Sequence, residues 1–267
     1  MENIAIEICN LRGYTFRGRV GAGGFKTTFK ISDKKNNFMA LKIFGKNSNL
    51  IRMEREIDTM KRLNKPNIAK LYEIDKVNIQ GQEYNFCIEE FCNGGTLMDR
   101  LQIDCVDRAH IIQLGNDLFG ILKLLISEEL LHRDIKPNNI LFRDNNWNMV
   151  LTDFGIVRDL NKTSITATYF PGGPHTPGYG APEQVYNKKV LQDWRTDQYA
   201  IGITLGICAT RIHPYKMDQD LADKGIIDPS FLILIKQKKL EVILKMIAPF
   251  PVMRYRDVDV LIQDWNN

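Results

Sequence analysis

The chain has 267 residues, of which 44% are hydrophobic and 25% charged. These values fit a globular protein with a sizeable core, built as one large domain or two small lobes. The net charge of +4 is too small to indicate binding to nucleic acid or to a membrane. No run of about eighteen uncharged apolar residues predicts a membrane span.

Cysteine usage indicates the compartment. The cysteines are odd in number, widely spaced and mostly set among apolar residues: Cys9, Cys87, Cys92, Cys105 and Cys208. This pattern predicts buried thiols in a reducing compartment rather than a disulfide framework or a zinc site. No basic segment followed by an apolar run marks a signal peptide. We therefore expect a cytoplasmic protein.

Positive charge is concentrated near the N-terminus. From Arg12 to Lys65 there are 14 Lys and Arg against 4 Asp and Glu. A solvated basic face is the commoner meaning of such a stretch, and a docking patch for an acidic partner is the alternative.

Residues 13–44 alternate in the manner of strands, and the glycine-rich segment 21–28 lies between two of them. Backbone N–H groups of such a loop can approach phosphate oxygens, because glycine has no side chain to obstruct them. A Walker A loop is excluded because Phe25 precedes Lys26 where glycine is required. A dinucleotide fingerprint is excluded because the chain continues as a strand. A plain glycine-rich hairpin is the alternative.

The middle of the chain predicts a mixture of elements. Apolar residues at helical spacing predict a helix over 50–64, strands follow at 68–79 and 83–91, and a long buried helix spans 107–127. Short strands at 139–142 and 149–151 flank a polar turn. Residues 153–183 are polar and rich in Gly and Pro, as a mobile segment should be.

One stretch places an acid, a lysine, an amide and a second acid close together in the chain. Asp134 lies five positions before Asn139, and Asp153 lies fourteen positions after it. Phosphoryl transfer needs such groups: a carboxylate to orient a hydroxyl, a cation for the phosphate and oxygen ligands for magnesium.

The pattern His-Arg-Asp-x-Lys-x-x-Asn followed by Asp-Phe-Gly resembles the core of a eukaryotic-type (Hanks-type) serine/threonine protein kinase. Further segments resemble the family in order: the Gly-rich loop at 21–28, Ala-x-Lys at 40–42, the hinge at 90–95, Thr-x-x-Tyr-x-Ala-Pro-Glu at 176–183, the central helix from 196 and the late arginine at 254. The resemblance covers about residues 14–265.

The resemblance implies an α+β, bilobal, protein-kinase-like fold in a single domain of residues 1–267. We expect a small β-rich N-lobe of about residues 1–91 with one regulatory helix, a hinge of about 90–95 and a larger, mainly helical C-lobe of about 96–267.

It also implies roles for individual residues. Asp134 would orient the attacking hydroxyl and accept its proton, and Lys136 would neutralise the moving phosphoryl group. Lys42, held by Glu56 (or by Glu54), would bind the triphosphate, and Asn139 and Asp153 would ligate Mg²⁺, or Mn²⁺ in its place. The implied ATP-binding residues are Val20, Gly21, Ala22, Gly23, Gly24, Phe25, Lys26, Thr28, Ala40, Lys42, Glu90, Cys92, Asn139, Leu141 and Asp153.

Two residues depart from the family pattern. Lys26 occupies the third glycine position of the loop, and Glu89 stands just before the hinge, where an apolar residue or a small hydroxyl is usual. A buried carboxylate needs a partner, and Lys42 is the nearest candidate. These departures support the alternative of a pseudokinase that serves as a nucleotide-binding scaffold.

Lys136 and Thr176 together are typical of kinases that act on Ser and Thr of protein substrates, with no role for nucleic acid or membrane. Arg133 resembles the residue that receives an activation-loop phosphate, yet the usual acceptor position is Gly172. The candidate acceptors upstream are Thr163, Ser164, Thr166, Thr168 and Tyr169. Either one of these is used or the enzyme is active without loop phosphorylation.

Overall fold

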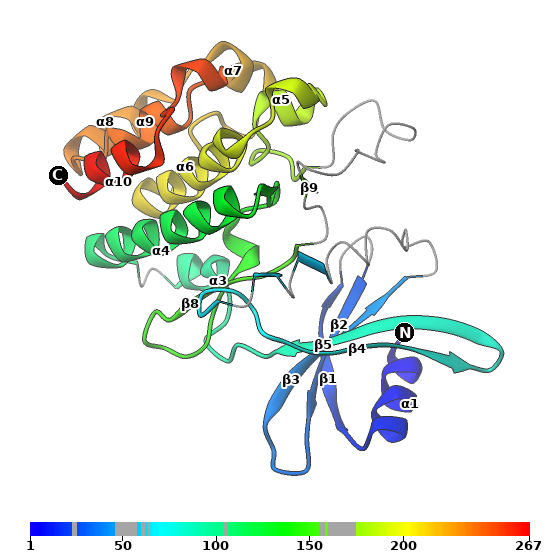
Figure 1. Cartoon of the computed structure of the whole chain (residues 1–267). Coiled ribbons are helices and arrows are strands. Elements are labelled where there is room, and N and C mark those ends of the chain that lie inside the picture. The colour runs from blue at the N-terminus through cyan, green and yellow to red at the C-terminus, as the bar shows by residue number, and fades with distance from the viewer. Residues whose placement is uncertain are drawn as a thin grey trace. The chain divides into compact units, whose positions relative to one another are not determined.

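The computed structural model describes residues 1–22, 26–45, 58–59, 62–63, 65–103, 106–154, 158–159 and 175–267. It divides into two compact units, Met1–Gly94 and Gly95–Asn267 (Figure 1). The boundary falls within the stretch that the sequence predicts as the hinge. The first unit is mainly a β-sheet and the second is mainly helical, so the expected α+β architecture is confirmed.

The smaller unit contains a five-stranded antiparallel sheet in the order β1-β2-β3-β5-β4. The strands are β1 Thr15–Ala22, β2 Lys26–Ser32, β3 Phe38–Phe44, β4 Leu71–Ile79 and β5 Gln82–Glu90. They lie within the ranges in which the sequence predicts strands. Of the helix predicted over 50–64, the described residues 58, 59 and 62 are helical. Glu54 and Glu56 lie outside the described residues.

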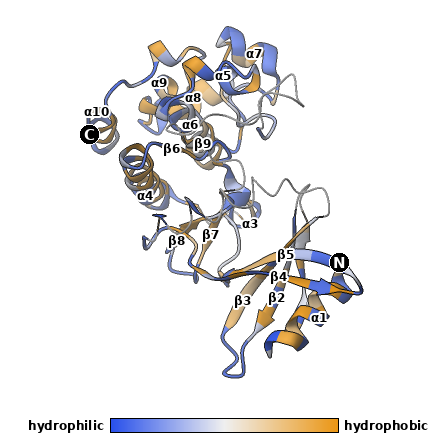
Figure 2. Ribbon diagram, turned by 45° about the vertical axis from the view of Figure 1, so that its right-hand side comes forward, coloured by the Kyte–Doolittle hydropathy of each residue, from blue (hydrophilic) through white to orange (hydrophobic). Residues whose placement is uncertain are grey.

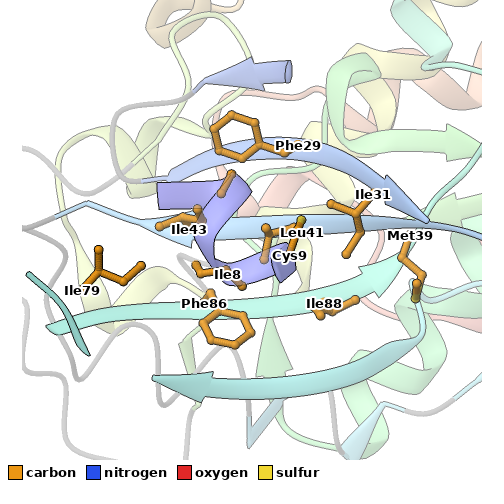
Figure 3. Packing of buried hydrophobic residues seen from close by; sticks show 11 residues of the cluster. Ile8, Cys9, Phe29, Ile31, Met39, Leu41, Ile43, Ile79, Phe86 and Ile88 are labelled. Carbon is orange, nitrogen blue, oxygen red and sulfur yellow. The ribbon is translucent and has the colours of Figure 1, made fainter. Parts of the chain in front are cut away.

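An N-terminal helix, α1 (Glu2–Arg12), covers one face of this sheet and was not predicted. Its buried residues Ala5, Ile8 and Cys9 join a core with residues of the strands. Figure 3 shows Ile8 and Cys9 among the apolar side chains of this core. The helix ends at Gly13, whose φ of 73° lies in the left-handed region that glycine adopts without strain. Both hydrophobic and polar residues occur on α1 (Figure 2), and Ala5, Ile8 and Cys9 are the buried ones.

The two faces of the sheet have different chemistry. Directly opposed residues on neighbouring strands point to the same face. The α1-covered face is apolar, with Phe29 opposite Leu41 and Leu41 opposite Ile88. The other face carries Thr28 opposite Lys42, and Ala40 opposite Glu89. The polar residues that the sequence assigns to ATP binding therefore lie on the face away from α1.

The larger unit is built around two long helices, α4 (Arg108–Ser127) and α6 (Trp194–Thr210), which pack against each other. Asp107 caps α4 by accepting the His110 N–H in a capping box. By length and composition alone α4 could cross a membrane. Eight of its residues are nevertheless buried, and it packs against both α6 and α10 (Val258–Asn266), as expected for a core helix.

The remaining elements of the larger unit are short. The helices are α3 Leu97–Gln102, α5 Pro182–Val185, α7 Gln219–Lys224, α8 Pro229–Gln237 and α9 Val242–Met246, with 3-10 turns η1 Pro137–Asn139, η2 Lys189–Leu191 and η3 Pro251–Met253. The strands are β6 Leu130–Leu131, β7 Ile140–Phe142, β8 Met149–Leu151 and β9 Arg158–Asp159. β6 pairs with β9, and β7 pairs with β8.

Candidate active site

The loop 132–139 leaves β6 and is fixed by a buried carboxylate of α6. Asp197 is fully buried and accepts the backbone N–H groups of His132 and Arg133, each at 2.8 Å. These bonds hold Arg133 at a φ of 65°, a conformation unfavourable for a residue with a side chain. Burial raises the pKa of Asp197, while His132 and the backbone N–H groups oppose that rise. The first turn of α6 thus fixes the backbone of the loop that carries Asp134.

His132 stabilises the same loop as a neutral imidazole. Its Nδ1 accepts the Asp134 N–H at 3.2 Å, so the ring proton lies on Nε2, which is 3.3 Å from the Thr152 carbonyl oxygen. The ring meets Phe154 edge-on, with centroids 4.7 Å apart. Burial lowers the pKa of His132, which favours this neutral form.

The carboxylate of Asp134 is surrounded by donors. Lys136 Nζ donates to both of its oxygens, at 3.1 and 2.9 Å. Thr176 Oγ1 donates to Oδ1 at 2.6 Å, and Lys136 Nζ also donates to this hydroxyl at 2.6 Å. Asn139 Nδ2 donates to Oδ2 at 2.9 Å. The structure therefore brings together all four side chains that the sequence assigns to this part of the site.

The donors expected for a divalent cation lie beside this carboxylate. Asn139 Nδ2 also donates to the Asp134 carbonyl oxygen at 2.8 Å, which directs the amide oxygen away from Asp134. The Thr152 N–H donates to the Asn139 carbonyl oxygen at 3.0 Å and so holds the start of Thr152-Asp153 next to the loop. Among the described residues no three His, Cys, Asp or Glu side chains cluster as a closed metal site. Two oxygen donors fit Mg²⁺, which usually keeps water and phosphate ligands as well.

The segment after residue 175 is tied to the loop by buried polar contacts. Glu183 forms an ion pair with Arg254, with Nη1–Oε1 at 2.7 Å. Gln184, which was not predicted, is buried and donates from Nε2 to the Arg133 carbonyl oxygen at 2.7 Å. The sequence signal for this contact is a polar residue directly after the Ala-Pro-Glu motif. The contact itself could not be predicted from local pattern, because Arg133 lies 51 positions away in the chain.

The smaller unit holds most of the residues predicted to contact the nucleotide. Val20, Gly21 and Ala22 end β1, Lys26 and Thr28 lie on β2, Ala40 and Lys42 on β3, and Glu90 ends β5 just before Cys92. Gly21, Thr28, Lys42 and Cys87 are consecutive partners across four strands. Gly23, Gly24 and Phe25 lie outside the described residues. Four further residues of the predicted site belong to the larger unit: Leu141, on β7, and Asp134, Asn139 and Asp153, outside that strand.

Lys42 has a carboxylate partner on the neighbouring strand. Lys42 Nζ forms an ion pair and hydrogen bond with Glu89 Oε2. Both residues are buried, with 7% and 1% of their surfaces exposed. The partner that the sequence required for a carboxylate at position 89 is therefore Lys42.

The candidate phosphate acceptors at 163–169 lie outside the described residues.

Sequence comparison agrees with this geometry, since the family model described as "Protein kinase domain" matches residues 14–249. The chain belongs to the protein kinase family. It is 28% identical to a probable serine/threonine-protein kinase of Clostridium perfringens over 92% of this chain and 36% of that protein. It is 27% identical to the serine/threonine-protein kinase cds1 of Schizosaccharomyces pombe over 92% of this chain and 56% of that protein.

A third relative, the serine/threonine-protein kinase PknD of Mycobacterium tuberculosis, is 30% identical over 79% of this chain and 32% of that protein. The kinase chain thus spans between about a third and somewhat over half of these relatives' lengths.

Proposed function

We propose that this kinase transfers the γ-phosphoryl group of ATP to Ser and Thr hydroxyls of protein substrates, with Mg²⁺, or Mn²⁺ in its place. The observation that carries the proposal is the environment of Asp134. Its carboxylate accepts a hydroxyl hydrogen bond from Thr176 at 2.6 Å while Lys136 and Asn139 fix its orientation. A substrate hydroxyl needs the same acceptor in order to be aligned and deprotonated.

The chain's own groups divide the remaining work between them. Lys136 Nζ supplies positive charge beside Asp134, where charge develops on the transferred group. Asn139 and Asp153 supply oxygen ligands for the cation, which neutralises phosphate charge when bound. Lys42 supplies the cation for the rest of the triphosphate. Catalysis would come mainly from positioning and electrostatics.

The test is phosphate transfer from labelled ATP and Mg²⁺ to a generic Ser- and Thr-containing protein such as casein. Asp134→Asn keeps the size of the side chain but removes the proton acceptor, so we expect the rate to fall by about 10²–10⁴-fold. Asp220→Asn is the control, because Asp220 is an exposed residue of α7 paired with Lys224. A fully active Asp134→Asn variant would contradict the proposal.

Acid hydrolysis of the labelled product tests the substrate class. We expect phosphoserine and phosphothreonine, and labelled phosphotyrosine alone would overturn the Ser/Thr assignment. Replacing Mg²⁺ with Mn²⁺ or Ca²⁺ tests the cation. The pseudokinase alternative predicts a thermal shift with ATP and Mg²⁺ but no transfer. Its support is weakened because Glu89 has a cationic partner.

We also propose a cytoplasmic, reducing environment for this chain. Cys9, Cys87, Cys92 and Cys208 are buried and form no disulfide in the part of the chain that the structure describes, and burial raises the pKa of Cys208 to about 12. We further propose that the basic stretch 12–65 binds an acidic partner, because Lys and Arg outnumber Asp and Glu there. Cross-linking in cells with and without 0.5–1 M salt, roughly the range that screens surface charge, would test it.

A further inference from the structure

A charged pair lies buried on the polar face of the smaller unit's sheet. Glu89 on β5 stands opposite Ala40 on β3, and Cys87 stands opposite Lys42. Glu89 and Lys42 are therefore diagonal neighbours on the same face, within reach of long side chains. The ladder between β3 and β5 runs without a break from Met39 to Ile43, so strand register sets their separation.

Both oxygens of the Glu89 carboxylate have partners. Oε2 meets Lys42 Nζ, and Oε1 lies 3.4 Å from the Cys87 thiol sulfur. Glu89 is 1% exposed and Lys42 is 7% exposed. By contrast, the pair Lys76–Glu83 joins β4 and β5 at 3.1 Å but is open to solvent, with side chains 64% and 54% exposed. Two Lys–Glu pairs on one sheet thus differ mainly in burial.

Because the Lys42–Glu89 contact is buried, each charged group depends on the other as its partner. A carboxylate and an ammonium withdrawn from water stay charged only while each has a partner. Each therefore holds the other in place, and the β3–β5 ladder holds both. An ammonium has three donors, so a bond to Glu89 is compatible with further bonds to phosphate oxygens.

We propose that Glu89 is a positioning residue that holds Lys42 from within the sheet for its contact with the nucleotide phosphates. The proposal rests on the phosphate-binding role of Lys42 in the proposed function. The resemblance to the family assigned the task of holding Lys42 to Glu56 or Glu54, on the predicted helix 50–64. The sheet itself supplies a carboxylate for that task, so the position of Lys42 follows from strand register.

Glu89→Gln tests this, with Glu83→Gln as the matched control on the same strand. We expect Glu89→Gln to raise the KM for ATP by about tenfold or more, since a hydrogen bond between charged groups is lost. The KM for the protein substrate should stay unchanged. A merely structural defect lowers the active fraction, and so the apparent kcat, without moving the KM for ATP. An unchanged KM for ATP would overturn the proposal.

A second readout needs no kinase activity. The labelling rate of Lys42 by an activated ester, followed by mass spectrometry, reports how strongly the amine is held in its protonated, unreactive form. Glu89→Gln should accelerate labelling of Lys42, whereas Glu83→Gln should leave it unchanged. If the wild-type chain transfers no phosphate, the proposed function fails, yet labelling still decides whether Glu89 holds Lys42. An unchanged labelling rate overturns the inference.

Glu89→Asp covers the case in which Glu89→Gln does not fold. It keeps the buried charge and withdraws the carboxylate by one methylene group. We expect a KM for ATP and a labelling rate that both rise relative to wild type, by less than in a folded Glu89→Gln. Wild-type values for both quantities would count against the proposal.

Discussion

Arg254 offers the most demanding test of how the larger unit is held together. Its side chain is fully buried and donates to Glu183 through Nη1 at 2.7 Å and Nη2 at 3.0 Å. It also donates to the carbonyl oxygens of Ala248, Arg195 and Pro249, at 2.8, 2.9 and 3.0 Å. A single guanidinium thus joins α5 and the first turn of α6 to the chain around η3.

Arg254→Met fills a similar volume but leaves the carboxylate of Glu183 buried without its cation. Breaking a buried ion pair from one side costs about 3–5 kcal/mol. Since a domain is typically stable by about 5–15 kcal/mol, the variant should lose roughly a fifth or more of its free energy of unfolding. The double variant Glu183→Met/Arg254→Met should lose less than the sum of the single losses, because neither charge remains unpaired.

Urea unfolding monitored by tryptophan fluorescence measures this loss. All three tryptophans, Trp147, Trp194 and Trp265, lie between residues 95 and 267, so the signal reports on the larger unit. Lys224→Met is the control, because the Lys224–Asp220 pair has side chains 58% and 70% exposed, and a solvent-exposed ion pair contributes little to stability. A loss below about 1 kcal/mol for Arg254→Met would refute the reasoning, since it would equal that of an ordinary hydrogen bond.

Two further predictions concern the same unit. Burial lowers the pKa of His132 below its usual 6.5, so the unfolded chain takes up this proton first and stability falls as pH drops below 6.5, by at most about 1.4 kcal/mol per pH unit. The His132→Asn variant cannot titrate at this position. Its free energy of unfolding, measured with urea, should fall less between pH 7.5 and 5.5, roughly the window around the usual pKa of histidine. An identical fall in the variant and the wild type would contradict the assignment. Gly115→Ala should destabilise α4 by about 1–3 kcal/mol, because a Cβ there would lie 2.4 Å from the Trp265 ring. Gly120→Ala on the same helix meets nothing within 4 Å and should instead stabilise by up to about 1 kcal/mol, and thermal melts of the pair distinguish the two.

Much of the fold follows from local pattern. The five strands and the long helix α4 form where the sequence predicts them, because hydrophobic spacing is a signal that acts over a few residues. The cluster around Asp134 could also be predicted, since Lys136 and Asn139 lie two and five positions away on a tight loop. Thr176 lies 42 positions away and was reached only through resemblance to the family.

The features that escaped prediction depend on tertiary contact. In α1 the apolar residues are spread around the helix, and Ile6 and Leu11 remain 39% and 62% exposed, so no clean stripe marks it. Its helical state follows from burial of Ala5, Ile8 and Cys9 against the sheet. The sheet face that α1 covers forms only in the folded chain, so it cannot be recognised in the sequence alone.

Glu89 shows how a violation of a local rule can identify a specific contact. A charged residue in a strand that is otherwise buried is unfavourable unless a partner compensates it, so its presence predicts a cation on the same face of the sheet. The register between β3 and β5 leaves Lys42 as the residue whose ammonium fills that requirement. Asp197 plays the corresponding part in the larger unit, where a fully buried carboxylate fixes the backbone next to Asp134. Each unit therefore contains a buried carboxylate with a local partner: Glu89 pairs with the Lys42 ammonium in the smaller unit, and Asp197 accepts backbone N–H groups next to Asp134 in the larger one.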